Sequence, residues 1–114
     1  MILVVDDDLE TRQALAAFFE AKGYAVALAD SARRGLEVIG EAWPDLIVLD
    51  LTMPEMSGWD FLAALRRIHN PAPVVIVFTG IQAQVDGVAA TVWKPNVEGL
   101  LQAVERHHRQ AVAR

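Results

Sequence analysis

Five polar side chains with complementary chemistry stand at the ends of short apolar runs in this sequence. They are three carboxylates, a hydroxyl and an ammonium group, from Asp6, Asp7, Asp50, Thr79 and Lys94. Clustered carboxylates repel one another unless a cation compensates their charge, and hard oxygen ligands suit Mg²⁺. An ammonium and a hydroxyl both donate to phosphoryl oxygens. Phosphoryl transfer needs this combination, and an aspartate can be its nucleophile, a role that Asp50 fits.

The elements that must bring these side chains together are predicted to be parallel strands. The apolar runs are Ile2–Val5, Tyr24–Leu28, Leu46–Leu49, Val74–Phe78 and Ala90–Trp93. Three of them are continuously hydrophobic, which is typical of strands covered on both faces. Amphipathic stretches with helical spacing alternate with them. The pattern predicts an α/β fold, a flavodoxin-like doubly wound parallel sheet of five strands in the order 2-1-3-4-5.

The carboxyl ends of the strands form the edge at which such sheets bind ligands. Four of the five predicted strands end in polar groups that can do chemistry. The first ends in Asp6-Asp7-Asp8, the third in Asp50, the fourth in Thr79 and the fifth in Lys94. If the sheet prediction is right, these groups converge on one crevice. Only the second strand contributes nothing obvious to it.

The composition restricts the possible functions. The 114 residues are expected to form one domain, residues 1–114, without cysteines for disulfide or thiolate chemistry. A net charge of −5 argues against direct binding to nucleic acid. The apolar runs are too short to span a bilayer and no secretion signal follows Met1, so a cytoplasmic protein without membrane contact is expected.

Four strings carry a resemblance to a known family. "ILVVDDD", "LIVLDLTMPEMSG", "VVIVFTG" and "VWKP", in this order over nearly the whole chain, resemble the receiver domain of bacterial response regulators. Each string alone is weak, but four at compatible spacings, each on a predicted strand end, are specific. The resemblance implies a phosphorylated signalling protein rather than an enzyme. Its implied partner is a sensor histidine kinase or phosphotransfer protein, which would pass a phosphoryl group to Asp50.

The resemblance also implies roles for the other site residues. Asp6, Asp7 and Asp50, with the backbone carbonyl of Thr52, match the Mg²⁺ ligands of the family. Thr79 matches the hydroxyl residue that turns toward the phosphate in the active state. Lys94 matches the lysine that pairs with the phosphoryl group, and its peptide bond to a following proline is usually cis in this family.

Several nearby polar residues have a simpler structural interpretation. Asp8 precedes a helix and is expected to be its N-cap rather than a metal ligand. Ser57 and Asp60 have the S-x-x-D spacing of a helix cap. The histidines, which do not lie at strand ends, are expected to be structural. Arg12 lies one helical turn after the acidic cluster and could touch it weakly.

The segment between Thr79 and Lys94 departs from the family pattern. It is several residues shorter than usual and carries Gly80 and Gly87, which disfavour a helix. We therefore predict that the fourth helix is absent or reduced to about one turn. The family usually has an aromatic residue three positions before the lysine, and here that position is Thr91. Trp93 is expected to cover the sheet face that the shortened helix leaves bare, either within the monomer or against a partner. The second case would make the protein a homodimer.

Two functional hypotheses remain open at this stage. The leading one is a stand-alone phosphoacceptor switch or relay without a fused output domain, which passes its state to an unknown downstream protein. Thr52 and Ile81 would then tune the lifetime of the aspartyl phosphate. The alternative is a receiver-like interaction module that is never phosphorylated. A phosphatase of the haloacid dehalogenase type is disfavoured because Thr52 stands where the second acid is needed, and a flavodoxin-type cofactor carrier because no phosphate loop follows the first strand.

Overall fold

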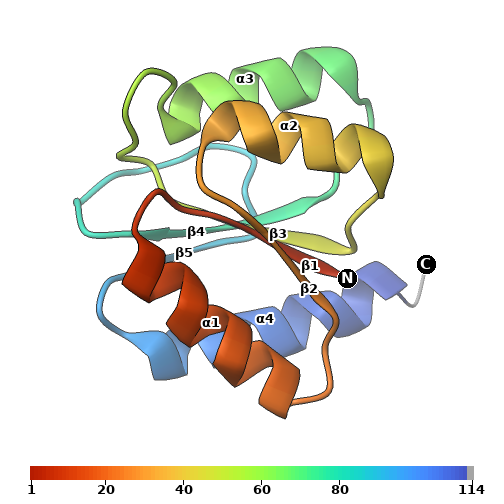
Figure 1. The fold of residues 1–114 in the computed structure, drawn as a ribbon. Helices are drawn as coiled ribbons and strands as arrows, with labels where there is room; N and C mark the ends of the chain where they lie inside the picture. Colours follow the sequence, from red (N-terminus) through yellow and green to blue (C-terminus); the bar gives the residue numbers. More distant parts are fainter. Residues whose placement is uncertain (113–114) are drawn as a thin grey trace.

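Five parallel strands form one sheet in the order β2-β1-β3-β4-β5 in the computed structural model, which describes residues 1–112 (Figure 1). The strands are β1 (Ile2–Val5), β2 (Val26–Ala29), β3 (Leu46–Leu49), β4 (Val74–Thr79) and β5 (Ala90–Trp93). The predicted fold class and strand order are confirmed. The register pairs Val5 with Ala29 and with Leu49, so β1, β2 and β3 end level with one another. The side chains that follow these strands therefore share one edge of the sheet.

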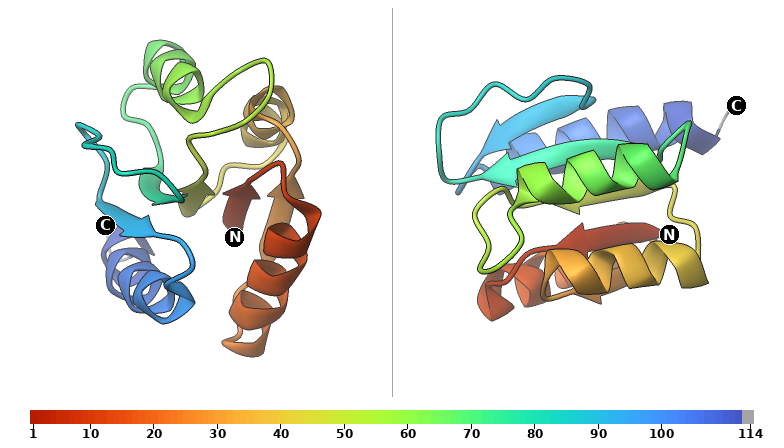
Figure 2. Two further views of the ribbon diagram at one scale, coloured as in Figure 1. Left: turned by 90° about the vertical axis from the view of Figure 1, so that its left-hand side faces the viewer. Right: turned by 90° about the horizontal axis from the view of Figure 1, so that it is seen from above.

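Within residues 1–112, four helices cover the two faces of the sheet. They are α1 (Leu9–Ala21), α2 (Ala32–Glu41), α3 (Gly58–Ile68) and α4 (Val97–Val112). Helices α1 and α4 lie on one face, and α2 and α3 lie on the other (Figure 2). None of the helices within residues 1–112 is long and apolar enough to cross a membrane.

The continuous apolar runs are explained by burial on both faces. Side chains alternate along each strand, so Leu3 and Val5 face α2 and α3, whereas Ile2 and Val4 face α1 and α4. All four are fully buried. Each large aliphatic side chain buried in this way contributes about 1.5–3 kcal/mol relative to exposure. The central strands thus form a rigid platform for the residues that follow them.

The helices that leave the site edge begin at side-chain caps. Asp8 accepts a hydrogen bond from the Thr11 amide at 3.0 Å, and Ser31 accepts one from the Arg34 amide at 3.1 Å. Ser57 and Asp60 exchange reciprocal hydrogen bonds in a capping box. The predicted capping roles are confirmed, and they fix where α1 and α3 start relative to the strand ends.

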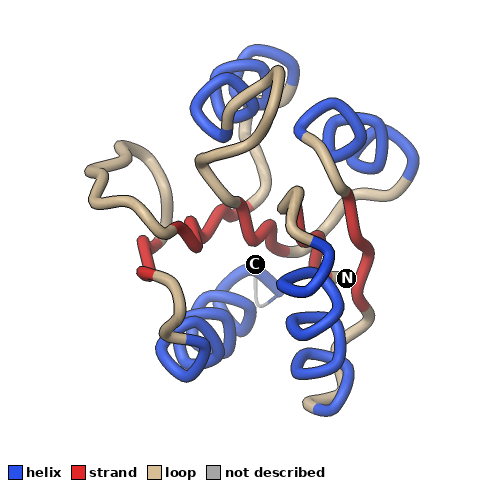
Figure 3. Tube along the Cα trace, turned by 60° about the vertical axis from the view of Figure 1, so that its left-hand side comes forward, coloured by secondary structure: helices blue, strands red, loops and turns tan. Residues whose placement is uncertain are grey.

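The connection from β4 to β5, residues 80–89, contains no helix, which confirms the prediction (Figure 3). Three of its apolar side chains pack against the core on the α2–α3 face: Ala83, Val85 and Val88. Arg66 of α3 donates a hydrogen bond to the backbone carbonyl of Asp86. Gly87 has a φ of 78°, and a Cβ there would lie 2.6 Å from the Arg66 guanidinium. The segment is thus irregular but anchored to α3.

Trp93 does not cover the face left by the missing helix within one molecule. Its side chain is 54% exposed, and the apolar side chains of residues 80–89 pack there instead. The prediction that Trp93 fills this role inside the monomer is therefore wrong. It failed because a short irregular segment can bury small aliphatic residues without a helix, which the sequence pattern did not reveal.

Candidate functional site

Three carboxylates meet beyond the ends of β1 and β3. One carboxylate oxygen from each of Asp6, Asp7 and Asp50 lies within 4.8 Å of the others. Asp6 and Asp50 are 2% and 5% exposed, whereas Asp7 faces solvent. The Asp50 amide donates to the Val5 carbonyl at 3.0 Å, which ties the two strand ends together. The cluster is therefore built on the rigid sheet, with one open side toward water.

Lys94 reaches this cluster from the end of β5. Its Nζ lies 2.9 Å from Asp6 Oδ2 and 3.5 Å from Asp50 Oδ2. It also lies 5.8 Å from the centroid of the Phe78 ring. Burial lowers the pKa of the Lys94 ammonium, but Asp6 and then Asp50 outweigh burial, so its pKa stands above the ordinary value. Lys94 is therefore a fixed positive charge at neutral pH.

Asp50 is held in an environment that disfavours its charge. Burial and the neighbouring charge of Asp6 raise the pKa of the Asp50 carboxyl, against the opposing effects of Lys94 and of the Thr52 amide. The Thr52 amide donates to Asp50 Oδ1 at 3.3 Å. Without a further cation the site is under-neutralised, because three carboxylates face one ammonium.

A glycine allows the chain to pack closely behind Asp50. A Cβ at Gly58 would lie 2.4 Å from the Asp50 carbonyl oxygen and 2.6 Å from Leu51 Cα. The Gly58 amide donates to the Leu51 carbonyl at 2.9 Å. The start of α3 is thereby held against the end of β3. The close approach explains why no larger residue fits at position 58.

Thr79 lies on the strand next to β5. It is fully buried, its Oγ1 accepts a hydrogen bond from the Ile81 amide at 3.4 Å, and its carbonyl accepts one from the Lys94 amide at 2.8 Å. Thr79 therefore lies where residues 80–89 leave the sheet, at the same edge as Lys94. Thr52 is exposed beside Asp50. The roles of the Thr79 hydroxyl and the Thr52 carbonyl stay predictions.

The residues present fit a hard divalent cation. All the side-chain donors are carboxylate oxygens, and the exposed position of Asp7 leaves room for water, which Mg²⁺ retains. The three acids and Lys94 sum to a charge of −2, which one divalent cation would balance. Asp6, Asp7 and Asp50 can therefore hold a magnesium ion.

Arg12 has a more direct contact with the site than its position in the sequence indicated. Its Nη1 donates to the backbone carbonyl of Asp6 at 2.8 Å. The signal was an arginine one turn into the helix that follows the acids, but the sequence could not show which atom it would meet. Away from the strand ends, His108 packs edge-on against Tyr24, with ring centroids 4.8 Å apart, and lies 3.4 Å from Asp45, as a structural histidine.

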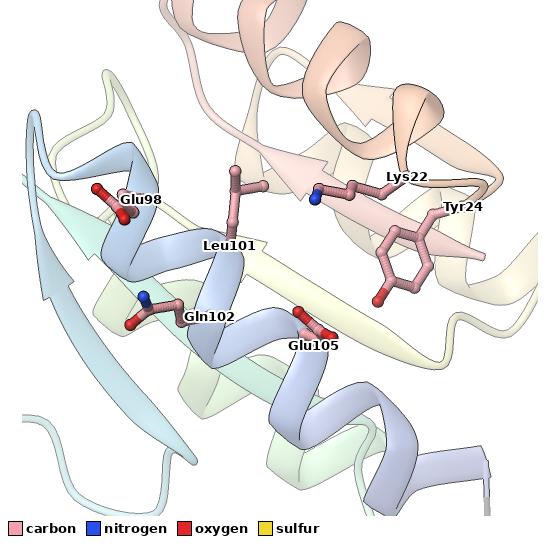
Figure 4. A pocket seen from close by; sticks show the side chains of 6 residues that line it. All are labelled: Lys22, Tyr24, Glu98, Leu101, Gln102 and Glu105. Carbon is pink, nitrogen blue, oxygen red and sulfur yellow. The ribbon is translucent and has the colours of Figure 1, made fainter.

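A separate cavity of about 300 Å³ lies between the end of α1 and α4 (Figure 4). It is lined by Lys22, Tyr24, Glu98, Leu101, Gln102 and Glu105. None of the three clustered carboxylates lines it, and two of its own charged groups are glutamates that would repel a phosphate. The carboxylate and ammonium cluster therefore remains the candidate site.

A doubly wound α/β domain with acids and a lysine converging on the ends of its strands has the architecture of a signalling receiver module. Comparison with known families agrees. The chain belongs to the response regulator receiver domain family, whose model matches residues 2–105. Receiver domains of this family are signalling domains of two-component systems.

The related curated proteins are much longer than this chain. The transcriptional regulatory protein ZraR of Escherichia coli is 34% identical over 116 residues, covering 93% of this chain and 26% of its own length. The response regulator MprA of Mycolicibacterium vanbaalenii is 37% identical over 76 residues, covering 67% of this chain and 33% of its own length. The chain thus spans about a quarter to a third of these relatives.

Solved structures share the whole fold. A CheY-like receiver domain protein from Methanospirillum hungatei gives a TM-score of 0.87 at 23% identity, covering 99% of this chain and 97% of that one. The response regulator TrrA from Thermotoga maritima, solved in complex with Mg(2+)-BeF, gives 0.84 at 26% identity, covering 93% and 96%. The fold is therefore shared over nearly the whole length despite the missing helix.

Proposed function

We propose that this protein is a phosphoacceptor of a two-component system. It takes a phosphoryl group onto Asp50 from the phosphohistidine of a sensor histidine kinase or a phosphotransfer protein. The observation that carries the proposal is the convergence of Asp6, Asp7 and Asp50 within 4.8 Å, with Lys94 in contact. We place this function in the cytoplasm, where such donors phosphorylate receiver domains.

The chain's own residues supply the nucleophile and most of the positioning. As the P–O bond to an Asp50 oxygen forms, the P–N bond of the phosphohistidine breaks and the imidazole leaves with the electron pair. Lys94, already 3.5 Å from Asp50, can donate to the transferred phosphoryl oxygens. The Thr79 hydroxyl begins buried beside Lys94 and would turn toward the new phosphoryl group.

Asp6, Asp7 and Asp50, with the backbone carbonyl of Thr52, would hold Mg²⁺ in this reaction. When bound, Mg²⁺ supplies positive charge that neutralises the phosphoryl oxygens during transfer. The site fits a divalent cation, because the three carboxylates and Lys94 together carry a charge of −2. The solved complex of TrrA with Mg(2+)-BeF supports the assignment by similarity.

The phosphorylated state would be read by a downstream partner protein. Residues 80–89 start at Thr79 and are anchored to α3, so a movement of Thr79 would be passed to this segment rather than to a helix. Trp93 is exposed beside it and could meet a downstream partner or a second copy of the chain.

The alternative is a receiver domain that binds partners without being phosphorylated. The missing fourth helix favours it, since the usual signalling surface is altered. One experiment distinguishes the phosphoacceptor from the unphosphorylated interaction module. The protein is incubated with acetyl phosphate and Mg²⁺, and the intact mass is measured for the wild type and for Asp50→Asn.

A base-labile phosphoryl adduct on the wild type that needs Mg²⁺ and disappears in Asp50→Asn supports phosphoacceptance. If the wild type forms no adduct and binds no beryllofluoride, the proposal is wrong and the interaction module is favoured.

A further inference from the structure

The geometry points to Arg12 as a positioning residue for the acidic turn: by holding the Asp6 carbonyl, it keeps the carboxylates of Asp6 and Asp7 converged and so raises the affinity for Mg²⁺. This inference rests on the proposed function. Within residues 1–112, Arg12 makes no hydrogen bond or ion pair with a carboxylate of the cluster. Its Nη1 instead donates to the main-chain oxygen of Asp6 at 2.8 Å.

The acidic turn needs such support because its own charges push it apart. Asp6 and Asp7 are consecutive and both offer an oxygen within 4.8 Å of Asp50. Like charges at this distance repel, and burial of Asp6 weakens the screening by water. The backbone of Asp6 is tied to β2 by its amide, which donates to the Ala29 carbonyl, and side-chain contacts add to how firmly the turn is fixed.

Four hydrogen bonds hold Asp6, and each restrains a different part of it. The Asp6 amide donates to the Ala29 carbonyl at 3.1 Å, and the Asp8 amide donates to Asp6 Oδ1 at 2.9 Å. Lys94 holds Oδ2 at 2.9 Å. Arg12 alone among these binds the carbonyl, and it connects the turn to the body of α1. Helix α1 is in turn fixed to the sheet by its buried side chains.

Two effects of Arg12 on a bound cation oppose each other, which makes the inference testable. As a positive charge near the site, Arg12 repels Mg²⁺, so removing it would tighten binding. As a hydrogen-bond donor it orders the ligands, so removing it would weaken binding. Arg12 is partly exposed, so solvent screens its charge, whereas its hydrogen bond joins a charged donor to the carbonyl of buried Asp6. Ordering is therefore expected to win.

The experiment measures Mg²⁺ affinity by calorimetry for the wild type, Arg12→Ala, Arg12→Gln and Arg12→Lys. Arg33→Ala is the matched control. It removes the same charge near the start of α2, and Arg33 makes no ion pair among residues 1–112. A second readout is the hydrogen exchange of the Asp8 amide relative to the core amide of Val4 in Mg²⁺-free protein. A global loss of stability speeds the exchange of Val4 at least as much as that of Asp8, so a larger acceleration at Asp8 than at Val4 reports a loosened turn.

Arg12→Ala and Arg12→Gln are expected to weaken Mg²⁺ binding roughly three- to tenfold, the scale of one ordinary intramolecular hydrogen bond. Arg12→Lys is expected to restore part of the affinity, and Arg33→Ala is expected to leave it unchanged or slightly tighter. In Arg12→Ala the exchange of the Asp8 amide should accelerate by a larger factor than that of the Val4 amide.

Tighter Mg²⁺ binding in Arg12→Ala, or unchanged exchange at Asp8, would overturn the positioning role. A wild type that binds no Mg²⁺ while Arg12→Ala still loosens the turn would overturn the proposed metal-dependent function. The positioning of the turn by Arg12 would then stand by itself. The two failures are thus distinguishable.

Discussion

The substitution Asp50→Asn is expected to stabilise the fold when Mg²⁺ is absent. The Asp50 charge lies within 4.8 Å of oxygens from Asp6 and Asp7, and at an effective dielectric constant of about 20 each repulsion is about 3.5 kcal/mol. The attraction to Lys94 at 3.5 Å is about 4.7 kcal/mol on the same scale. A net repulsion of about 2 kcal/mol remains before screening at the exposed Asp7 and Lys94 sides reduces it.

The expected gain for Asp50→Asn at neutral pH is therefore about 1–2 kcal/mol, which corresponds to a rise in Tm of about 4–8 °C for a chain of this length. Thermal unfolding followed by circular dichroism in EDTA measures it. Asp30→Asn is the matched control, because Asp30 is an exposed acid at the end of β2 and its removal changes the net charge equally. The control should move Tm by less than half as much.

The pH dependence has a defined sign. Burial and Asp6 raise the pKa of the Asp50 carboxyl, so its charge destabilises the fold above that pKa. As the pH falls through the raised pKa, wild-type Asp50 takes up a proton and the penalty is relieved. The difference in Tm between Asp50→Asn and the wild type should therefore shrink toward acid pH.

Saturating Mg²⁺ should reverse the order, because a ligand that binds only the folded state raises Tm and the wild type has the more complete ligand set. A lower Tm for Asp50→Asn in EDTA at neutral pH would refute the reasoning. A Tm difference that grows toward acid pH would refute it as well.

Three further substitutions test the surroundings of the site. Gly58→Ala should lower the free energy of unfolding by about 1–3 kcal/mol, because the added Cβ overlaps the backbone of Asp50 and Leu51. Gly40→Ala is the control and should be neutral or stabilising, because a Cβ there meets no atom within 4 Å. Urea unfolding of both variants measures the difference. Ser57→Ala should lose about 1 kcal/mol in the same assay, because the capping box of α3 is removed, and no loss would show that the cap is not needed. Lys94→Met should abolish transfer from acetyl phosphate, and it should destabilise the fold because buried Asp6 loses its partner at 2.9 Å. A stable variant with full transfer would contradict the role given to Lys94.

The strands and the acids at their ends were predictable because local chemistry determines them. Buried parallel strands must be continuously apolar, so the first polar residue after β1 or β3 marks a strand end. Asp8 and Ser57 were recognisable as caps for the same reason, since a cap is a contact between neighbours in the chain.

Contacts between distant residues were less predictable. The sequence could not show that Lys94 would lie closer to Asp6 than to Asp50, because a lysine side chain is flexible and its nearest partner depends on packing. It also could not show that Arg12 would meet a backbone carbonyl. The absence of a helix between β4 and β5 was predictable from the short length of this segment and from its glycines. The path of residues 80–89 along α3 was not predictable, because it depends on the hydrogen bond from the Arg66 side chain to the Asp86 carbonyl.

The site of phosphorylation is the most direct test of the functional proposal. The protein is treated with acetyl phosphate and Mg²⁺, reduced with borohydride, digested and sequenced by tandem mass spectrometry, since borohydride converts an aspartyl phosphate to homoserine. Homoserine at position 50 and at no other aspartate is the expected result. A label at Asp6 or Asp7, or no label under conditions in which a known receiver domain is modified, would contradict the proposal that the strand ends assemble a phosphoacceptor at Asp50.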